Sequence, residues 1–294
     1  MKYAWIHEHR DLFPVAQMCD VLCVSRSGYY NSLDRKPSPR AQRRERILYA
    51  VRRVHAETKG IYGSVKLAKV LQQRQDLEVA CRNTIARAMR EMGLKSRVSK
   101  AFTPTTTQAD PTQQPAPNTL DRDFTADAPD RKWVTDITYL ATTAGWVYLA
   151  VVIDLFSRKV VGWAMSESLA TTLASDALRQ AIESRRPDGK RLLHHSDRGC
   201  QYTSDAYQRT LQALGIACSM SRTGNCYDNA VMERFFWSLK YEWTNHETFD
   251  NLDAARLSVF KYIETFYNSQ RLHQTLGYQS PNQYEAVHAP VVAA

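Results

Sequence analysis

The stretch Lys132-Trp-Val-Thr-Asp-Ile-Thr-Tyr139 carries an aspartate, Asp136, in the middle of a run of strand-forming residues. A charged side chain is unfavourable at such a position by propensity and by burial, so its presence indicates a chemical role. Two further acids stand out for related reasons. Asp197 ends a second strand-like run, and Glu233 lies on an apolar-rich helical run. The 35 residues from 198 to 232 separate these two acids.

Three carboxylates at strand ends and on a packed helix are suited to holding divalent cations. Oxygen ligands suit Mg²⁺, and two ions roughly 3.5–4 Å apart can activate an attacking oxygen and stabilise a leaving one at the same phosphorus. We therefore expect Asp136, Asp197 and Glu233 to be metal ligands and catalytic residues, with two Mg²⁺ ions for which Mn²⁺ can substitute. A single acid is more often structural, which is our interpretation of Asp154.

Three polar residues near these acids are predicted to support them. His195 precedes Asp197 by two positions, and a strand-end histidine near a carboxylate more often orients a ligand or packs than binds metal itself. Asn229 lies four residues before Glu233 on the same helical stripe. Lys240 lies seven residues after Glu233, about 10 Å along the helix axis. That position is within reach of DNA lying across the metal ions.

Residues 131–294 alternate between strand and helix patterns. A three-strand meander followed by alternating helices and strands is typical of a mixed five-stranded α/β sheet flanked by helices. The expected strands are 132–142, 146–155, 160–165, 192–196 and 216–220. The expected helices are 171–185, 204–214, the helix that carries Glu233, and 252–268.

Charge is unevenly distributed along the chain, whose net charge is +9. Residues 1–100 carry +12, residues 101–130 carry −4 and residues 131–294 carry +1. A basic first third predicts a phosphate-binding module attached to a near-neutral domain. Residues 101–130 are rich in Thr, Pro, Gln and Ala without apolar periodicity, and we expect them to form an extended linker.

The basic segment contains two patterns of short helices joined by turns. Residues 1–40 are expected to form one helix-turn-helix unit, and residues 41–100 a second helix-turn-helix-like DNA-binding domain. The side chains expected to contact DNA are Arg26, Ser27 and Tyr29 in the first unit and Arg82, Asn83, Thr84 and Arg87 in the second. Such residue types reach phosphates and base edges from a recognition helix.

Several function classes are disfavoured. The chain has no Gly-x-x-x-x-Gly-Lys-Ser/Thr run for nucleotide hydrolysis, no long apolar run and no signal-like segment, so we expect a protein of the cytosol that does not engage a membrane. Its six cysteines form no C-x-x-C pair and no zinc-finger spacing. A tyrosine recombinase could use Tyr202 or Tyr227, although the Arg/His/Arg set that such enzymes need cannot be assembled convincingly.

At these residues the chain resembles the OrfB-type transposases of bacterial insertion sequences, whose catalytic core is similar to retroviral integrase and has an RNase H-like fold. The resemblance covers nearly the whole chain, and the 35-residue interval from Asp197 to Glu233 is one of its marks. The matching segments are Trp133-Val-Thr-Asp-Ile-Thr-Tyr139, Tyr148-Leu-Ala-Val-Val-Ile-Asp-Leu-Phe-Ser157, His195-Ser-Asp-Arg-Gly-Cys-Gln-Tyr202, Tyr227-Asp-Asn-Ala-Val-Met-Glu-Arg-Phe-Phe-Trp-Ser-Leu-Lys240 and Tyr267-Asn-Ser-Gln-Arg-Leu-His-Gln-Thr-Leu276.

The resemblance implies that Asp136, Asp197 and Glu233 form a DDE metal-binding triad and that Lys240 touches the transposon end. It implies metal-dependent cleavage and strand transfer at insertion-sequence ends, performed by a homo-multimer on transposon-end and target DNA. Such a chain often acts as the downstream part of an OrfA–OrfB fusion, in which OrfA brings a further helix-turn-helix and a leucine zipper. Helix-turn-helix units stand here where retroviral integrase has a zinc-binding module.

Three alternatives remain open at this point. The chain could be an OrfB part that binds DNA and needs fusion to OrfA for activity. It could instead be an RNase H-like nuclease without strand transfer, against which the basic helical front end argues. A DNA-binding regulator without turnover is the third, and the intact set of three acids argues against it.

Overall fold

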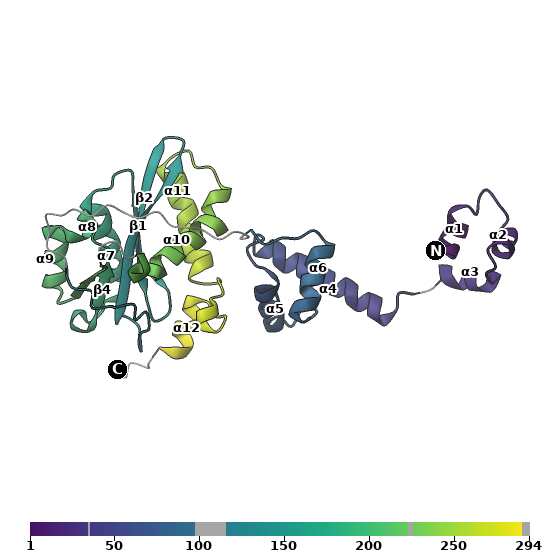
Figure 1. Cartoon of the computed structure of the whole chain (residues 1–294), viewed down its shortest axis with the longest axis horizontal. Helices are drawn as coiled ribbons and strands as arrows, with labels where there is room; N and C mark the ends of the chain where they lie inside the picture. Colours follow the sequence, from purple (N-terminus) through teal and green to yellow (C-terminus); the bar gives the residue numbers. More distant parts are fainter. Residues whose placement is uncertain (35, 98–115, 223–225, 290–294) are drawn as a thin grey trace. The chain divides into compact units, whose positions relative to one another are not determined.

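The chain comprises two compact units, Met1–Lys95 and Ser96–Ala294 (Figure 1). The computed structural model describes residues 1–34, 36–97, 116–222 and 226–289, without the side chains of 226 and 227. Within these ranges no helix is both long and apolar enough to cross a membrane. The sheet and its helices belong to the second unit, and the first unit is helical.

The first three helices pack around one small core. They are α1 (Lys2–Glu8), α2 (Val15–Val21) and α3 (Arg26–Leu33). Helix α3 begins where sequence predicts, since the Ser25 side chain accepts a hydrogen bond from the backbone N–H of Gly28 at 3.2 Å. The core residues are Ile6, Met18, Cys19 and Tyr29. Helix α1 was not predicted, because Ile6 is its only buried side chain and one apolar position makes no periodic pattern.

The next three helices form a second cluster, in the part of the chain where the second helix-turn-helix-like domain is expected. They are α4 (Pro39–Glu57), α5 (Ser64–Gln73) and α6 (Arg82–Glu91). Ser38 caps α4 and Pro39 occupies its first turn, a position that needs no amide hydrogen. Gly93, with a φ of 67°, follows the end of α6, as its freedom to adopt a left-handed conformation predicts. Buried apolar residues line the inner faces of all three helices.

The second unit is built on the predicted mixed sheet of five strands. They are β1 (Lys132–Thr142), β2 (Gly145–Asp154), β3 (Val160–Ser166), β4 (Leu193–Ser196) and β5 (Ala217–Met220). Their order is β3-β2-β1-β4-β5, with β1, β2 and β3 antiparallel and β4 and β5 parallel to β1. The prediction of an α/β fold with a sheet flanked by helices is confirmed.

Helices cover both faces of this sheet (Figure 1). On one side lie α7 (Thr171–Arg185), α8 (Cys200–Thr203) and α9 (Asp205–Ala213), and on the other α10 (Ala230–Glu242), α11 (Leu252–Phe260) and α12 (Pro281–His288). Short 3₁₀ turns connect them at η1 (Gly189–Arg191), η2 (Cys226–Asn229), η3 (Thr244–His246) and η5 (Gln274–Leu276). The helix expected at 252–268 becomes π-helical in its second half, η4 (Lys261–Tyr267). Apolar periodicity alone does not distinguish a π-helix from an α-helix.

The segment 116–130 corrects part of the linker prediction, because it packs on the second unit. Leu120 is buried. The backbone N–H groups of Thr119 and Leu120 donate to Ser219 Oγ at 2.9 and 3.1 Å, and Met220 N donates to Pro117 O at 3.3 Å. These contacts cover the outer edge of β5. Residues 101–115, the rest of the predicted linker, lie outside the described ranges.

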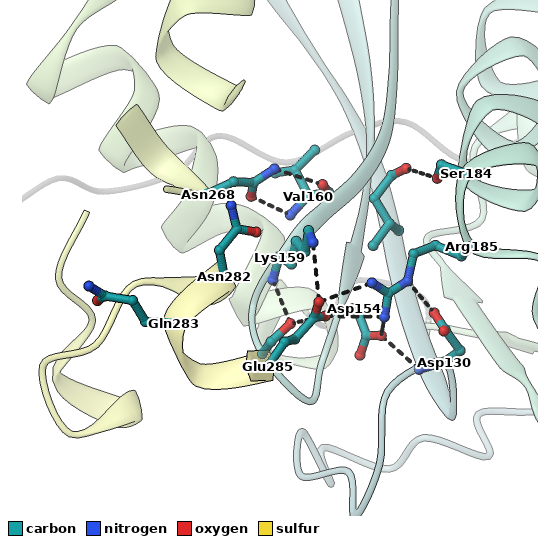
Figure 2. A network of polar contacts seen from close by, with 12 residues as sticks. Asp130, Asp154, Lys159, Val160, Ser184, Arg185, Asn268, Asn282, Gln283 and Glu285 are labelled. Atoms are coloured by element: carbon teal, nitrogen blue, oxygen red, sulfur yellow. Dashed lines mark hydrogen bonds and ion pairs between the residues drawn. The ribbon is translucent and has the colours of Figure 1, made fainter. Parts of the chain in front are cut away.

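A side chain closes the opposite edge of the sheet. The Asn268 amide accepts a hydrogen bond from Val160 N and donates one to Val160 O, both at 3.0 Å (Figure 2). Further along β3, Gln180 Oε1 accepts from Trp163 N at 2.6 Å. The amide of Asn268 therefore pairs with β3 as one residue of a neighbouring strand would.

Asp154 is structural, in agreement with our interpretation of it. It ends β2, is fully buried and belongs to the polar network of Figure 2. The Arg185 guanidinium donates to Asp130 at 2.9 Å and to both oxygens of Glu285 at 3.0 and 3.1 Å, and it lies 3.6 Å from Asp154. Burial raises the pKa of Asp154 to about 7. Because Glu285 belongs to α12, this network fastens the last helix to the sheet.

A close approach of α7 to β3 yields a stability prediction. A Cβ atom added at Gly162 would lie 2.3 Å from Ala177 O and 2.7 Å from Ala181 N, and both are backbone atoms of α7. We expect Gly162→Ala to lower the free energy of unfolding by about 1–3 kcal/mol, because the helix must move away from the sheet. Urea unfolding measures this, with exposed Ser168→Ala as the control. Equal midpoints for the two variants would contradict the close approach.

Candidate catalytic site

The strand register brings the two predicted aspartates together. Strands β1 and β4 are parallel, with Trp133 opposite His194 and Val134 opposite His195. Continued by two residues, the same register sets Asp136 beside Asp197 on strands that lie about 4.8 Å apart. Asp197 is one residue beyond the end of β4. Its Oδ1 accepts a hydrogen bond from Gly199 N at 2.9 Å, so the chain turns directly after this carboxylate.

Glycine at position 199 is part of how that turn is made. A Cβ atom there would lie 3.0 Å from Asp197 Oδ1 and 3.1 Å from Gln201 Oε1. Both are tighter than ordinary contacts, so a larger residue would press on the carboxylate. The sharp departure from the strand that sequence predicts at this glycine is confirmed.

Helix α10 lies along the part of β1 that β4 leaves unpaired, and it carries the third acid. At its start, Asn229 Nδ2 donates to Thr135 O at 3.3 Å. Near its end, Lys240 Nζ lies 4.7 Å from the centre of the Tyr139 ring. Glu233 falls between these two contacts, beside the segment of β1 that contains Asp136. The three acids therefore come from one strand, one strand end and one helix, as predicted.

The electrostatics of the three acids show that they are close and partly desolvated. Burial, then the negative charge of Asp197 and that of Glu233, raise the pKa of Asp136 well above its usual range, against a hydrogen bond from Ile137 N. Burial likewise raises the pKa of Asp197, although Gly199 N opposes it, and burial raises the pKa of Glu233. Metal-free, this arrangement of negative charge is unfavourable.

Both ring nitrogens of His195, two residues before Asp197, contact serine side chains. Its Nδ1 lies 2.9 Å from Ser219 Oγ and its Nε2 lies 3.1 Å from Ser221 Oγ. Ser219 already accepts two backbone N–H groups, so its own proton points to Nδ1 and Nε2 donates to Ser221. Burial lowers the pKa of His195 to about 4, which keeps the ring neutral. His194 is equally buried, with Nε2 3.1 Å from Tyr207 Oη.

Tyr202 is unsuited to be a nucleophile. It is 1% exposed and its hydroxyl lies 3.3 Å from Thr135 Oγ1. Burial, together with the charges of Asp136 and Asp197, raises the pKa of Tyr202 well above 10. The other candidate of the tyrosine-recombinase hypothesis, Tyr227, has its side chain outside the described part.

Buried ion pairs hold α10 at both ends, and sequence reasoning missed them. Before the helix, Asp228 is inaccessible to solvent and accepts hydrogen bonds from Asn118 (2.9 Å), Arg122 (3.0 Å) and Arg222 (3.0 Å from its N, 3.2 Å from its Nε). These contacts lower the pKa of Asp228 to about 2 against the opposing effect of burial. The sequence signal that could have indicated this anchor is the acidic Asp228 followed directly by the amide Asn229.

At the other end of α10, Glu242 and Arg271 form a buried two-pronged pair. Arg271 Nε and an NH group each lie 2.6 Å from a Glu242 oxygen, and the same guanidinium donates to Ser238 Oγ at 3.1 Å. Tyr262 Oη donates to Glu242 at 3.3 Å. Arg271 comes from one of the segments that carried the family resemblance. The role of this arginine is therefore to position the helix that bears Glu233.

The predicted DNA-contacting residues of the first unit differ in solvent exposure. In α6, Arg82, Asn83 and Arg87 are exposed and Thr84 is half-buried, with its hydroxyl 3.3 Å from Cys81 Sγ. In α3, Arg26 and Ser27 are exposed. Tyr29 corrects the prediction: it is 2% exposed in the core of α1–α3, while the neighbouring Tyr30 is 50% exposed. Adjacent residues on a helix point about 100° apart, and sequence alone did not say which of the two tyrosines faces the core.

Comparison with known proteins identifies the family. The model of the integrase core domain matches residues 126–226, a second integrase core domain model matches 214–281, and an HTH-like domain matches 42–102. The transposase InsF for insertion sequence IS3A of Escherichia coli (strain K12) is 41% identical over 290 residues, covering 97% of this chain and 98% of that protein. The chain belongs to the OrfB-type transposases of the IS3 family.

A second relative agrees with this assignment, and a solved structure is also similar to the chain. A 31 kDa protein of insertion element IS600 from Shigella sonnei is 41% identical over 264 residues, which is 90% of this chain and 96% of that protein. A solved intasome of simian T-cell lymphotropic virus, in complex with PP2A regulatory subunit B56 gamma, covers 82% of this chain and 76% of its own, at 18% identity and a TM-score of 0.47. The matching family models show that the transposase combines an HTH-like domain with an integrase core domain.

The Asp228 anchor generates a stability prediction for the transposase. Asp228→Asn leaves two arginines without their buried acceptor, so we expect the free energy of unfolding to fall by about 1–3 kcal/mol at pH 7. Because the pKa of Asp228 is lowered in the folded protein, its contribution is present above about pH 4 and lost as the pH falls toward about 2. Urea unfolding at pH 7 and pH 3 measures both effects.

The control for that experiment is Asp121→Asn. Asp121 pairs with the same Arg222 at 3.1 Å, but its side chain is 73% exposed, and we expect little change from its loss. Equal destabilisation by the two substitutions would show that Asp228 is no anchor.

Repulsion among the three acids predicts that removing one charge stabilises the metal-free transposase. A raised carboxyl pKa means that stability is lost as the pH rises, so we expect Asp136→Asn to raise the Tm at pH 8 more than at pH 5. Each 1 kcal/mol relieved corresponds to about 2–4 °C in a unit of this size. Calorimetry in a chelator measures it, with exposed Asp127→Asn as control. A lower Tm for Asp136→Asn at pH 8 would contradict this account.

Proposed function

We propose that the transposase cuts DNA at the ends of its insertion sequence and joins the freed 3′ ends to a target, with Asp136, Asp197 and Glu233 holding two divalent cations. The observation that carries the proposal is the parallel register of β1 and β4, which sets two aspartates side by side with Glu233 on the adjoining helix. Within the described residues no basic side chain pairs with these acids, so protonation or a bound cation would relieve their negative charge.

The residues present fit Mg²⁺. Carboxylate oxygens are the ligands it prefers, and it keeps several waters. Asn229 Oδ1 is buried and has no hydrogen-bond partner within the described residues, so a donor such as a water of a hydrated cation would satisfy it. In the same ranges no three His, Cys, Asp or Glu side chains are packed tightly enough to enclose an ion. We infer that Glu233, the most loosely placed of the three acids, moves toward the aspartates when a cation binds.

The chemistry follows from this arrangement. Bound Mg²⁺ would supply activation of the attacking oxygen and neutralisation of charge on the leaving one. The chain's own residues position the reaction: Asn229 fixes the start of α10 on β1, and the neutral His195 holds the end of β4 against β5. Lys240, above the Tyr139 ring, is placed to contact a DNA phosphate. Positioning and charge neutralisation are the main sources of rate in such displacements.

We further propose that the active form is a multimer on DNA, since strand transfer joins two ends, and that an OrfA portion contributes to assembly. The helix-turn-helix-like domain supports binding to transposon ends, and the exposed Arg82, Asn83 and Arg87 of α6 are the side chains we place on base edges and phosphates. Adding the fused upstream frame to the reaction tests the OrfA contribution directly.

Cleavage by variants tests the catalytic assignment. With Mg²⁺ or Mn²⁺ and a labelled duplex carrying the insertion-sequence end, we expect Asp136→Asn, Asp197→Asn and Glu233→Gln each to lower the nicking rate by at least about 100-fold, or ~2.7 kcal/mol. DNA binding should stay within about twofold of the parent. The control is Asp176→Asn, an exposed acid of α7 that pairs with its neighbour Arg179 at 2.8 Å. Full nicking by any of the three variants would overturn the assignment.

A further inference from the structure

Aromatic and cationic side chains form a continuous strip that begins at Glu233. On α10, the Arg234 guanidinium lies 4.2 Å from the centre of the Trp237 ring, and Trp237 stacks on Tyr241 at 5.3 Å and 29°. Trp237 is one helical turn after Glu233 and shares its stripe. Lys240 continues that stripe. We call the six residues Arg234, Trp237, Lys240, Tyr241, Tyr139 and Trp146 the aromatic strip.

The strip crosses from α10 to the β1–β2 hairpin through Lys240. Its Nζ lies 4.7 Å from the centre of the Tyr139 ring, and Tyr139 meets Trp146 edge-on at 5.1 Å and 89°. Tyr139 is 54% exposed and Trp146 is 56% exposed. The strip therefore runs from beside the acids to two aromatic rings that are open to solvent.

Packing does not account for the two exposed aromatic residues of the strip, Tyr139 and Trp146. Helix α10 buries a different set, Phe235, Phe236 and Leu239, against the core of the second unit. An exposed aromatic ring forgoes the free energy that burial would provide. Large aromatics on a surface beside two cations are typical of sites that bind unpaired nucleotides, since every base has a face to stack and every phosphate a charge to pair.

We propose that the aromatic strip binds one or two bases of a DNA strand that is unpaired next to the scissile phosphodiester, by stacking on Tyr139 and Trp146. Bases inside a duplex are stacked on each other and cannot offer a face to these rings. Unpairing costs a few kcal/mol, and stacking on an aromatic side chain contributes about 1–3 kcal/mol per base, so the two are of similar size. Arg234 and Lys240 pair with the phosphates of that strand. The inference rests on the proposed function for its position beside the scissile bond.

The test compares two DNA substrates with the full-length transposase and needs no cleavage. Binding is measured by fluorescence anisotropy, in a chelator, for a labelled blunt duplex of the insertion-sequence end and for the same duplex with its last three base pairs mismatched. We expect Tyr139→Ala/Trp146→Ala to weaken binding of the mismatched duplex about tenfold or more and that of the blunt duplex less than twofold. The control is Phe260→Ala, an aromatic residue of α11 that is 47% exposed and outside the strip.

Conservative variants separate stacking from a structural effect. Tyr139→Phe/Trp146→Phe keeps two ring faces, and we expect it to restore binding of the mismatched duplex to within about twofold of the parent. Equal loss on both duplexes, no loss on either, or loss that the Phe pair does not restore would overturn the proposal. No loss on either duplex would favour a protein partner for this surface, and loss that the Phe pair does not restore would indicate a structural effect. Because this readout is independent of nicking, its failure is distinguishable from failure of the catalytic assignment.

Discussion

The second unit holds three carboxylates close together in a partly desolvated site. Their negative charges repel one another, and other contacts of the fold must offset this repulsion. The sheet contributes what a loop could not. Parallel pairing of β1 with β4 sets the spacing of two aspartates by backbone hydrogen bonds, and a one-residue slip would send one of them to the opposite face. Burial and the negative charges of Asp197 and Glu233 raise the pKa of Asp136 in this register.

The third acid, Glu233, lies on helix α10. A helix and a strand are not joined by a ladder of backbone hydrogen bonds, so side-chain contacts must hold α10 in position. Helix α10 is fastened before its first turn by Asp228 and at its last residue by Glu242, which pairs with Arg271. Each pair is buried on the acid's side and satisfied by several donors, the condition under which an ion pair specifies position rather than only costing desolvation. Between the two anchors, Asn229 binds the strand backbone directly.

Much of this could be predicted from the sequence because the strands are long and the acids interrupt their patterns. The bounds of β1 and α7 agree with prediction to the residue. The misses are places where tertiary contacts decide: α1 has one buried residue, the second half of 252–268 winds into a π-helix, and residues 116–130 pack although their composition is that of a linker.

In the candidate site, too, some residues could be predicted from the sequence and others only from tertiary contacts. The three acids could be predicted from the sequence, because carboxylates are disfavoured at the strand and packed-helix positions where they occur. Asp228 did not, because an acid before a helix is ordinary until its arginines are seen, and those come from segments about a hundred residues away or across an adjacent loop. Tyr29 and Tyr30 could be assigned to core and surface only once the first helix, itself unforeseen, was in place.

The closed edges of the sheet carry a consequence for assembly. Asn268 and Gln180 occupy the backbone groups of β3, and residues 117–120 lie over β5, so neither border offers a free row of donors and acceptors at these points. Strand-to-strand addition, the commonest accidental route by which β-proteins stick to themselves, is blocked there. At these points copies of the chain cannot associate by adding a strand, so any contact between copies there would have to use side-chain surfaces.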